Sequence, residues 1–257
     1  MAQLIAHVVT ASALVLGVAL PAGAIGKVQA AELQVLAGGA MTAPMKELAA
    51  QFESATGHKI VFRFGTTPEL IKLATTGSPF DLGVVPREVF RDPAAQARFA
   101  PGPTSDIARV GLGVAVRSGA PKPNIGTPEE LKQTLLQAQS IASIPESAAG
   151  AQVLRAFERL GIGEAMKAKL KAQKAPAQVV EAVSRGEAEL GVFLVNVLTA
   201  PGVDVVGPFP AELQQEVVFT AAVAAVTKEA EAANAFIAYL TTPAATTVIK
   251  AKGMTPG

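Results

Sequence analysis

Short apolar runs alternate with segments of helical spacing along most of the chain, and no other feature of the sequence constrains the fold more. The runs 33–36, 60–64 and 81–85 have the length and composition of buried strands. Between the first two, apolar residues recur from Met45 to Phe52 at the spacing of one helix face. An order of strand, helix, strand, helix, strand predicts a parallel sheet in an α/β domain.

Two segments also carry the residues that begin helices. Thr67, Pro68 and Glu69 follow the second strand, and they predict a helix with Thr67 as its N-cap and Pro68 at its first position. The acidic Glu69 suits the positive end of that helix. Thr127 and Pro128 repeat this pattern later in the chain.

The alternation continues to the C-terminus, and no linker rich in Gly, Ser or charge interrupts it. Further strands are expected at 110–116, 141–144, 190–194, 203–206 and 217–226, and further helices after Gly150 and at 177–184, 230–240 and 244–251. These are too many strand–helix units for one small domain. We therefore expect two α/β lobes that share one chain, each with its own core.

Residues 1–30 have the pattern of a secretory signal peptide. A dense apolar stretch ends at Pro21, and small residues then suit cleavage after Ala24 or Ala30. Because the stretch has no preceding Lys or Arg and is long enough to span a bilayer, an uncleaved membrane anchor is the alternative. We expect an exported, periplasmic protein.

The composition excludes several classes of function. The chain has no cysteine, which excludes disulfides, thiolate metal sites and cysteine nucleophiles. It has only two histidines, His7 and His58, and the second follows Gly57 in what reads as an exposed turn. A net charge of +1 argues against nucleic-acid binding. We therefore predict no catalytic residues, no metal site and no cofactor.

Candidate ligand-binding loops follow from the predicted strands. In open α/β sheets, ligands bind beyond the C-terminal ends of the strands. The loops at those ends are 38–42, 65–68, 145–150 and 194–197.

These loops also carry a resemblance to a known family, the molybdate-type solute-binding proteins of ABC transporters. The segments that carry it are LQVLAGGAMTAPMKELAAQFE (33–53), FGTTPELIKLATTGSPFDLGVVP (64–86), IPESAAGAQVLRAFERLGI (144–162), VVEAVSRGEAELGVFLVNVL (179–198), VVGPFPAELQQEVVFTAAVA (205–224) and the closing KGMTPG. No single motif is highly specific, and the order and spacing of the segments together carry the resemblance.

The resemblance implies a type II periplasmic binding protein fold, in which the chain crosses a hinge twice. One lobe would hold residues 31–110 and 216–257, and the other would hold 111–215. A small anionic ligand would bind between the lobes, and lobe closure would trap it. The loaded protein would then dock on a membrane permease. We expect a monomer, because no coiled-coil pattern or long apolar stripe suggests otherwise.

The resemblance also implies that unpaired N–H groups at helix beginnings hold the anion, since such groups attract anions without a counter-ion. The helix beginnings expected to face the cleft lie at 40–42, 66–68 and 148–150. We carry the family's ligand contacts over to the matching positions of this chain and add their neighbours in these loops. The predicted ligand-binding residues are then Gly39, Ala40, Met41, Thr66, Thr67, Ser147, Ala149, Pro176 and Leu194.

The chain departs from the family pattern at three of these positions. Ala40 replaces a usual serine, Leu194 replaces a common tyrosine, and Pro176 lacks an N–H. A site for a dianion loses about 1–3 kcal/mol for each missing hydrogen bond to charge. A monoanion or a small organic acid is therefore a candidate ligand, with charge supplied by Arg63 or Arg87 if either side chain reaches the cleft.

Two other functions fit the same scaffold. The first is a ligand sensor without a transport role, which the sequence does not distinguish from an import receptor. The second is a periplasmic enzyme, for which Glu146 would have to pair with Asp81 or Glu69 as acid and base.

Overall fold

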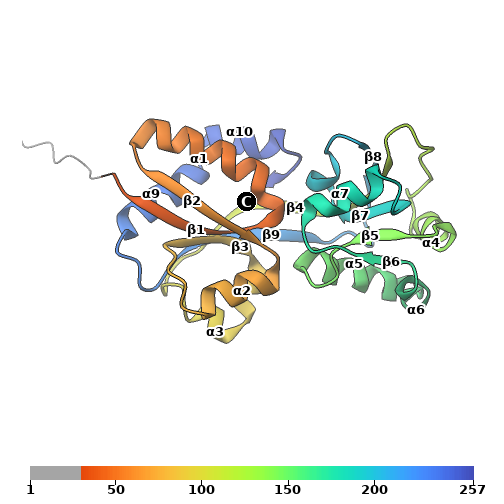
Figure 1. Ribbon diagram of the computed structural model, residues 1–257, viewed down its shortest axis with the longest axis horizontal. Helices are drawn as coiled ribbons and strands as arrows, with labels where there is room; N and C mark the ends of the chain where they lie inside the picture. The colour runs from red at the N-terminus through yellow and green to blue at the C-terminus, as the bar shows by residue number, and fades with distance from the viewer. Residues whose placement is uncertain (1–29) are drawn as a thin grey trace, which may run out of the picture.

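The computed structural model describes residues 30–257, which form two α/β halves lying side by side (Figure 1). The predicted signal peptide lies outside the described residues, apart from Ala30. Within residues 30–257, no helix combines the length and the apolar composition that crossing a bilayer requires. The predicted α/β class is confirmed, and the elements alternate as the sequence indicates.

The first half opens with the predicted strand–helix alternation. Its elements are β1 (Glu32–Gly38), the 3-10 turn η1 (Gly39–Met41), α1 (Thr42–Thr56), β2 (Lys59–Gly65), α2 (Thr67–Thr75), β3 (Leu82–Pro86), η2 (Arg87–Arg91) and α3 (Pro93–Gln96). Strand β1 pairs in parallel with both β2 and β3. The carboxyl ends of these strands therefore meet at one edge of the sheet.

The second half follows without a flexible linker. Its elements are β4 (Ser105–Arg117), α4 (Pro128–Gln137), β5 (Ile141–Ser143), α5 (Ala148–Arg159), α6 (Gly163–Lys167), β6 (Leu170–Ala172), α7 (Pro176–Ser184), β7 (Leu190–Leu194), α8 (Val195–Leu198) and β8 (Val203–Pro208). The chain then returns to the first half through β9 (Glu216–Val223), α9 (Ala230–Leu240), α10 (Pro243–Ala251) and β10 (Thr255–Pro256).

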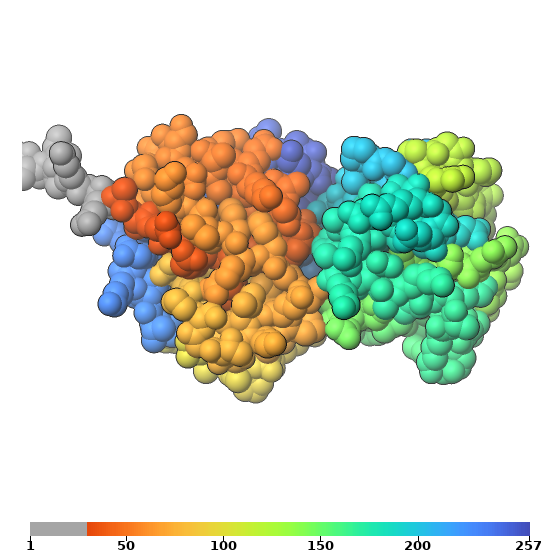
Figure 2. Space-filling view, viewed as in Figure 1, coloured from red at the N-terminus to blue at the C-terminus, as the bar shows by residue number. Residues whose placement is uncertain are grey.

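Two antiparallel strands, β4 and β9, connect the halves. Strand β4 pairs with β9 over residues 105–111 and with β7 and β8 over residues 112–117. Strand β9 also pairs with β3 of the first half. The strands thus form one curled, mixed sheet in the order β2-β1-β3-β9-β4-β7-β5-β6. The pairing is parallel within each half and antiparallel where the chain crosses between them. Figure 2 shows the two halves meeting along a seam.

Most helix boundaries follow the sequence signals. Thr127 caps α4, and its hydroxyl accepts the Glu130 N–H. Gly57 ends α1 with a φ of 78°, a left-handed conformation that glycine adopts without strain. One prediction is off by a residue, because Thr66 is the N-cap of α2 and Thr67 is its first residue. The Glu69 carboxylate accepts the Thr66 N–H at 2.7 Å, which fixes the earlier start.

His58 differs from the expectation of an exposed turn. Its side chain is only 5% exposed, stacks on Phe52, and accepts the Ala31 N–H at Nδ1 over 3.0 Å. The residue is buried because the N-terminal end of β1 needs a hydrogen-bond acceptor there and α1 supplies an aromatic surface. The imidazole is therefore structural.

Candidate functional site

A small cavity lies between the two halves and brings together almost every predicted site residue. Its volume is about 30 Å³. Its lining comes from Gly38, Gly39, Ala40, Gly65, Thr66, Thr67, Pro86, Ile144, Ser147, Ala148, Ala149, Pro176, Phe193, Leu194, Val217 and Phe219. Of the predicted residues, only Met41 is absent from this lining, because its side chain is fully buried in the core of the first half.

Direct contacts close the two halves around this cavity. The Ala148 N–H at the start of α5 donates to the Thr67 hydroxyl at the start of α2 over 3.0 Å. The Asn196 side-chain amide donates to the Ala40 carbonyl over 2.8 Å. A Cβ on Gly39 would lie only 3.1 Å from the Pro176 ring. Both halves therefore contribute to the lining of the cavity.

The start of α5 leaves one N–H group for a ligand. The first N–H, of Ala148, is taken by Thr67, and the third, of Gly150, donates to the Ser147 hydroxyl over 3.0 Å. Among the described residues no hydrogen bond engages the second, of Ala149, and a helix start offers it no intrahelical partner. The Ser147 hydroxyl also donates to the Ile144 carbonyl, so this predicted ligand residue acts here as a helix cap.

Close backbone packing holds the start of α5 in place. A Cβ added to Gly150 would lie 1.8 Å from the Ile144 carbonyl oxygen, so a larger residue does not fit. Glycine at this position therefore allows the first turn of α5 to reach the cavity.

The start of α2 contributes mainly through Thr67, whose side chain is only 9% exposed. Its oxygen accepts from Ala148, which leaves its own proton free to donate into the cavity. The N–H of Thr67 lies in the first turn, where no intrahelical acceptor exists, and Pro68 has no N–H. The carboxylate of Glu69 accepts both the N–H and the hydroxyl of Thr66, which removes Thr66 as a donor.

The rest of the lining is apolar or small. The side chains of Ile144, Phe193, Leu194 and Phe219 supply no hydrogen-bonding atom. No lining residue of the cavity has a titratable side chain. The cavity thus suits a group that is held by a few amide and hydroxyl donors and is surrounded by hydrocarbon.

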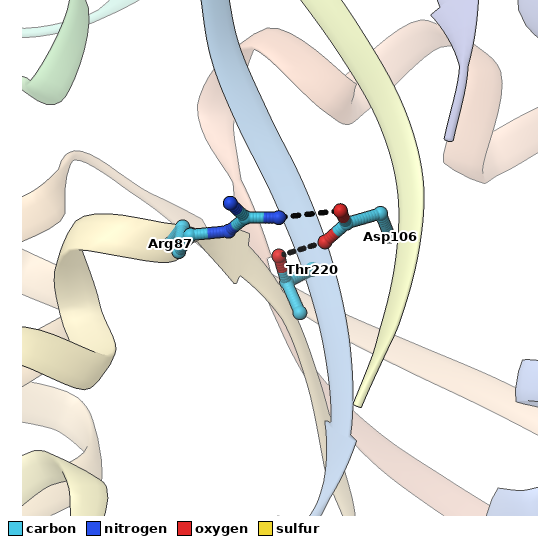
Figure 3. Close-up of polar contacts among 3 residues, drawn as sticks. All are labelled: Arg87, Asp106 and Thr220. Atoms are coloured by element: carbon cyan, nitrogen blue, oxygen red, sulfur yellow. Dashed lines mark hydrogen bonds and ion pairs between the residues drawn. The ribbon is translucent and has the colours of Figure 1, made fainter. Parts of the chain in front are cut away.

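Arg63 and Arg87 do not line the cavity and do not supply the charge considered above. Arg63 donates to the Pro79 carbonyl. Arg87 forms an ion pair with Asp106, whose other oxygen accepts the Thr220 hydroxyl at 2.7 Å (Figure 3). Burial alone would raise the pKa of Asp106, but the hydrogen bonds from Arg87 and Thr220 outweigh it and hold that pKa below its usual value. This cluster ties η2 to the crossing strands.

An open groove of about 900 Å³ adjoins the cavity, and the sequence patterns gave no indication of it. Its walls come from α1, α2 and α10 of the first half and from α7, α8 and the residues before α7 of the second. Figure 1 shows α10 and α7 on opposite sides of the seam. Lys174, Lys250 and Lys252 line it. Because Lys174 lies before α7 and the other two lie at the end of α10, only the tertiary structure brings the three together.

The described residues hold no group of three or more His, Asp or Glu side chains able to bind a metal ion.

Comparison with known proteins places the chain in a family. Residues 33–255 match the family model described as bacterial extracellular solute-binding protein. The chain belongs to that family.

Two relatives and one solved structure refine this placement. The aconitate isomerase of Pseudomonas sp is 34% identical over 233 residues, which cover 87% of each chain. The molybdate-binding protein of Azotobacter vinelandii is 32% identical over 249 residues, which cover 92% of this chain and 95% of that one. The solved periplasmic molybdate-binding protein of Azotobacter vinelandii superimposes with a TM-score of 0.73 at 22% identity, covering 86% and 98%. The resemblance to molybdate-type periplasmic binding proteins and the two-lobe fold are confirmed.

Proposed function

We propose that this protein captures a small anion between its two lobes and delivers it to the permease of an ABC importer. The lobes comprise residues 31–110 with 216–257 and residues 111–215, and strands β4 and β9 form the double crossing. The protein acts as a monomer in the periplasm, to which residues 1–30 direct it. Membership in the solute-binding family supports this role.

One observation carries the proposal. The first turns of α2 and α5 come from different lobes, meet through the Ala148–Thr67 hydrogen bond, and face one cavity. Each helix start presents N–H groups and a partial positive charge, which together favour an anion. A ligand that contacts both starts binds the closed form better than the open form and therefore shifts the population towards closure.

The names of two relatives support an anionic ligand. Their names specify molybdate in one case and aconitate in the other, and both are small and negatively charged. The absence of a hydroxyl at Ala40 and Leu194, and of an N–H at Pro176, weakens the case for molybdate in this chain. An organic acid fits the mixture of few donors and apolar walls better.

A thermal-shift panel tests the proposal. We expect at least one member of a set containing molybdate, tungstate, sulfate and small carboxylates to raise the melting temperature, because a ligand bound only to the native state stabilises it. A ligand at 100 times its Kd stabilises the fold by about 2.7 kcal/mol. If no anion in the panel shifted the transition, anion capture would be rejected.

The second candidate is an isomerase acting on a small organic acid, and the 34% identical aconitate isomerase favours it. Proton transfer would need a titratable group beside the cavity. Asp81 is unsuitable, because its carboxylate accepts from the Gln34 N–H and the Thr227 hydroxyl. Glu69 lines the adjoining groove and lies in the first turn of α2, one of the two helix starts.

Proton exchange separates the two candidates. Following cis- and trans-aconitate by NMR in heavy water reports both interconversion and deuterium uptake. An isomerase gives turnover that falls at least a hundredfold in Glu69→Gln, whereas a binding protein gives neither turnover nor exchange. Glu130→Gln, which alters the matching acid of α4 far from the cavity, serves as the control.

A further inference from the structure

The groove beside the cavity extends the proposed binding site. Gly39, Ala40, Gly65, Thr66 and Pro176 line both spaces. The two spaces are therefore immediate neighbours, with these residues between them. The cavity, at about 30 Å³, accommodates only a small part of an organic molecule, whereas the groove has about 900 Å³.

The charge lining the groove is positive. Its charged lining residues are three lysines, Lys174, Lys250 and Lys252, and one carboxylate, that of Glu69. Lys252 pairs with Glu47 at 2.7 Å, and Glu69 is occupied by Thr66. Within residues 30–257, Lys174 and Lys250 have no ion-pair partner. Two cations are thus left to attract a negative group in the groove.

The two lysines belong to different lobes. Lys174 lies just before α7 in the second lobe, and Lys250 lies in the last turns of α10 in the first. An anionic group between them would draw both lobes together. This contact would favour the closed arrangement of the lobes, as the contact between α2 and α5 does.

The donors of the cavity match a carboxylate better than a tetrahedral oxyanion. At the starts of α2 and α5 they are the N–H and hydroxyl of Thr67 and the N–H of Ala149, whereas Ser147 is engaged as a cap. A planar carboxylate presents two oxygens to these donors and leaves its hydrocarbon against Phe193 and Leu194. A tetrahedral dianion presents four oxygens, and the apolar walls would leave some of them without partners.

We propose that the ligand is an organic anion with at least two carboxylates, one bound by Thr67 and Ala149 in the cavity and another bound by Lys174 and Lys250 in the groove. This inference rests on the proposed function, since it assumes that an anion binds between the lobes. It adds the ligand class and two residues outside the helix starts.

Titration calorimetry on the full chain tests the proposal with four probes: tricarballylate, succinate, propionate and molybdate. Tricarballylate carries three carboxylates, succinate carries two, and propionate carries one. We expect the polycarboxylates to bind at least tenfold more tightly than propionate or molybdate. In the double variant Lys174→Gln/Lys250→Gln, we expect their affinity to fall about five- to tenfold, with propionate affinity unchanged.

A matched control removes two lysines that do not line the groove, one from each lobe. Lys46→Gln/Lys171→Gln makes the same change in net charge, and both side chains are exposed on α1 and β6. We expect this variant to bind all four probes as the parent does. Equal losses in the two double variants would overturn the groove site, because long-range charge alone would then explain them.

Three other results would each reject a different part of the proposal. If molybdate bound tightly and the polycarboxylates did not, the ligand class proposed here would be wrong while anion capture stood. If tricarballylate bound tightly but Lys174→Gln/Lys250→Gln left its affinity unchanged, the placement of the second carboxylate would be wrong. If no probe bound and the wider anion panel also failed, the proposed function itself would be rejected.

Discussion

The starts of α2 and α5 present the same kind of backbone donors to one cavity, but they are built differently. Helix α5 begins with uncharged residues, and the Ser147 hydroxyl caps it. Helix α2 carries the Glu69 carboxylate in its first turn, where the charge stabilises the helix but opposes a bound anion. The difference indicates that the backbone N–H groups of α5 bind an anion better than those of α2, and that α2 contributes chiefly through the Thr67 hydroxyl.

The largest expected effect is at the tightest point of α5. Gly150→Ala places a Cβ 1.8 Å from the Ile144 carbonyl oxygen. We expect a loss of about 3 kcal/mol or more in unfolding free energy, because backbone on both sides must move. Urea denaturation measures this loss. The matched control is Gly126→Ala, where the nearest atom, Glu130 Oε2, is 3.4 Å away and no comparable loss is expected.

Removing the Thr67 hydroxyl tests the contact that joins the two helix starts. Thr67→Val keeps the shape but leaves the buried Ala148 N–H without its acceptor. We expect a stability loss of about 1–3 kcal/mol and an affinity for the bound anion about tenfold lower. Thr75→Val, which alters an exposed hydroxyl bonded within α2, should change neither quantity appreciably. Unchanged affinity in Thr67→Val would remove this hydroxyl from the site.

Neutralising Glu69 tests the opposing charge directly. Glu69→Gln keeps an acceptor for the Thr66 N–H but removes the negative charge from the first turn of α2. We expect anion affinity to rise about two- to fivefold, which corresponds to about 0.5–1 kcal/mol. Calorimetry with the best-binding anion measures the change. Glu130→Gln makes the same substitution at the start of α4, away from the cavity, and should leave affinity unchanged.

The smallest effect is expected at the Arg87–Asp106–Thr220 cluster, which stabilises the crossing strands and not the helix starts. The pKa of Asp106 in the folded protein is lower than its ordinary value of 3.8. The charged carboxylate therefore stabilises the fold fully above pH 3.8, and this stabilisation is lost as the pH falls through the folded pKa. We expect Asp106→Asn to cost about 0.5 kcal/mol at pH 7 and less in acid. Urea denaturation at pH 7 and in acid measures this loss of unfolding free energy, and the same experiment is repeated with Arg87→Gln. A loss that does not depend on pH would contradict the prediction.

The sequence predicted the strand–helix order well, because each element carries its own local signal. Apolar spacing located α1, and the Thr127–Pro128 pair located the start of α4. Other features had no such signal, among them the short α6 and β6, which depend on packing, and the buried position of His58. The N-cap of α2 was misplaced by one residue because two adjacent threonines are equivalent until Glu69 selects Thr66.

The sequence also predicted part of the candidate site, because that part depends on local signals. Helix starts are local, so the loops containing Ala40, Thr67 and Ala149 were identified, and the structure brings them around one cavity. The direction and partners of side chains are not local. The structure therefore decides that Met41 is core, that Ser147 is a cap, and that Arg87 is bound to Asp106.

The sequence by itself determined the two-lobe α/β class and the helix starts that offer amide donors, because strand length, helix periodicity and capping act within a few residues. Only the tertiary structure decided which donors remain unused and which lysines face the groove. Those outcomes depend on contacts between segments far apart in the chain, such as Thr67 with Ala148, and no local pattern encodes such distances.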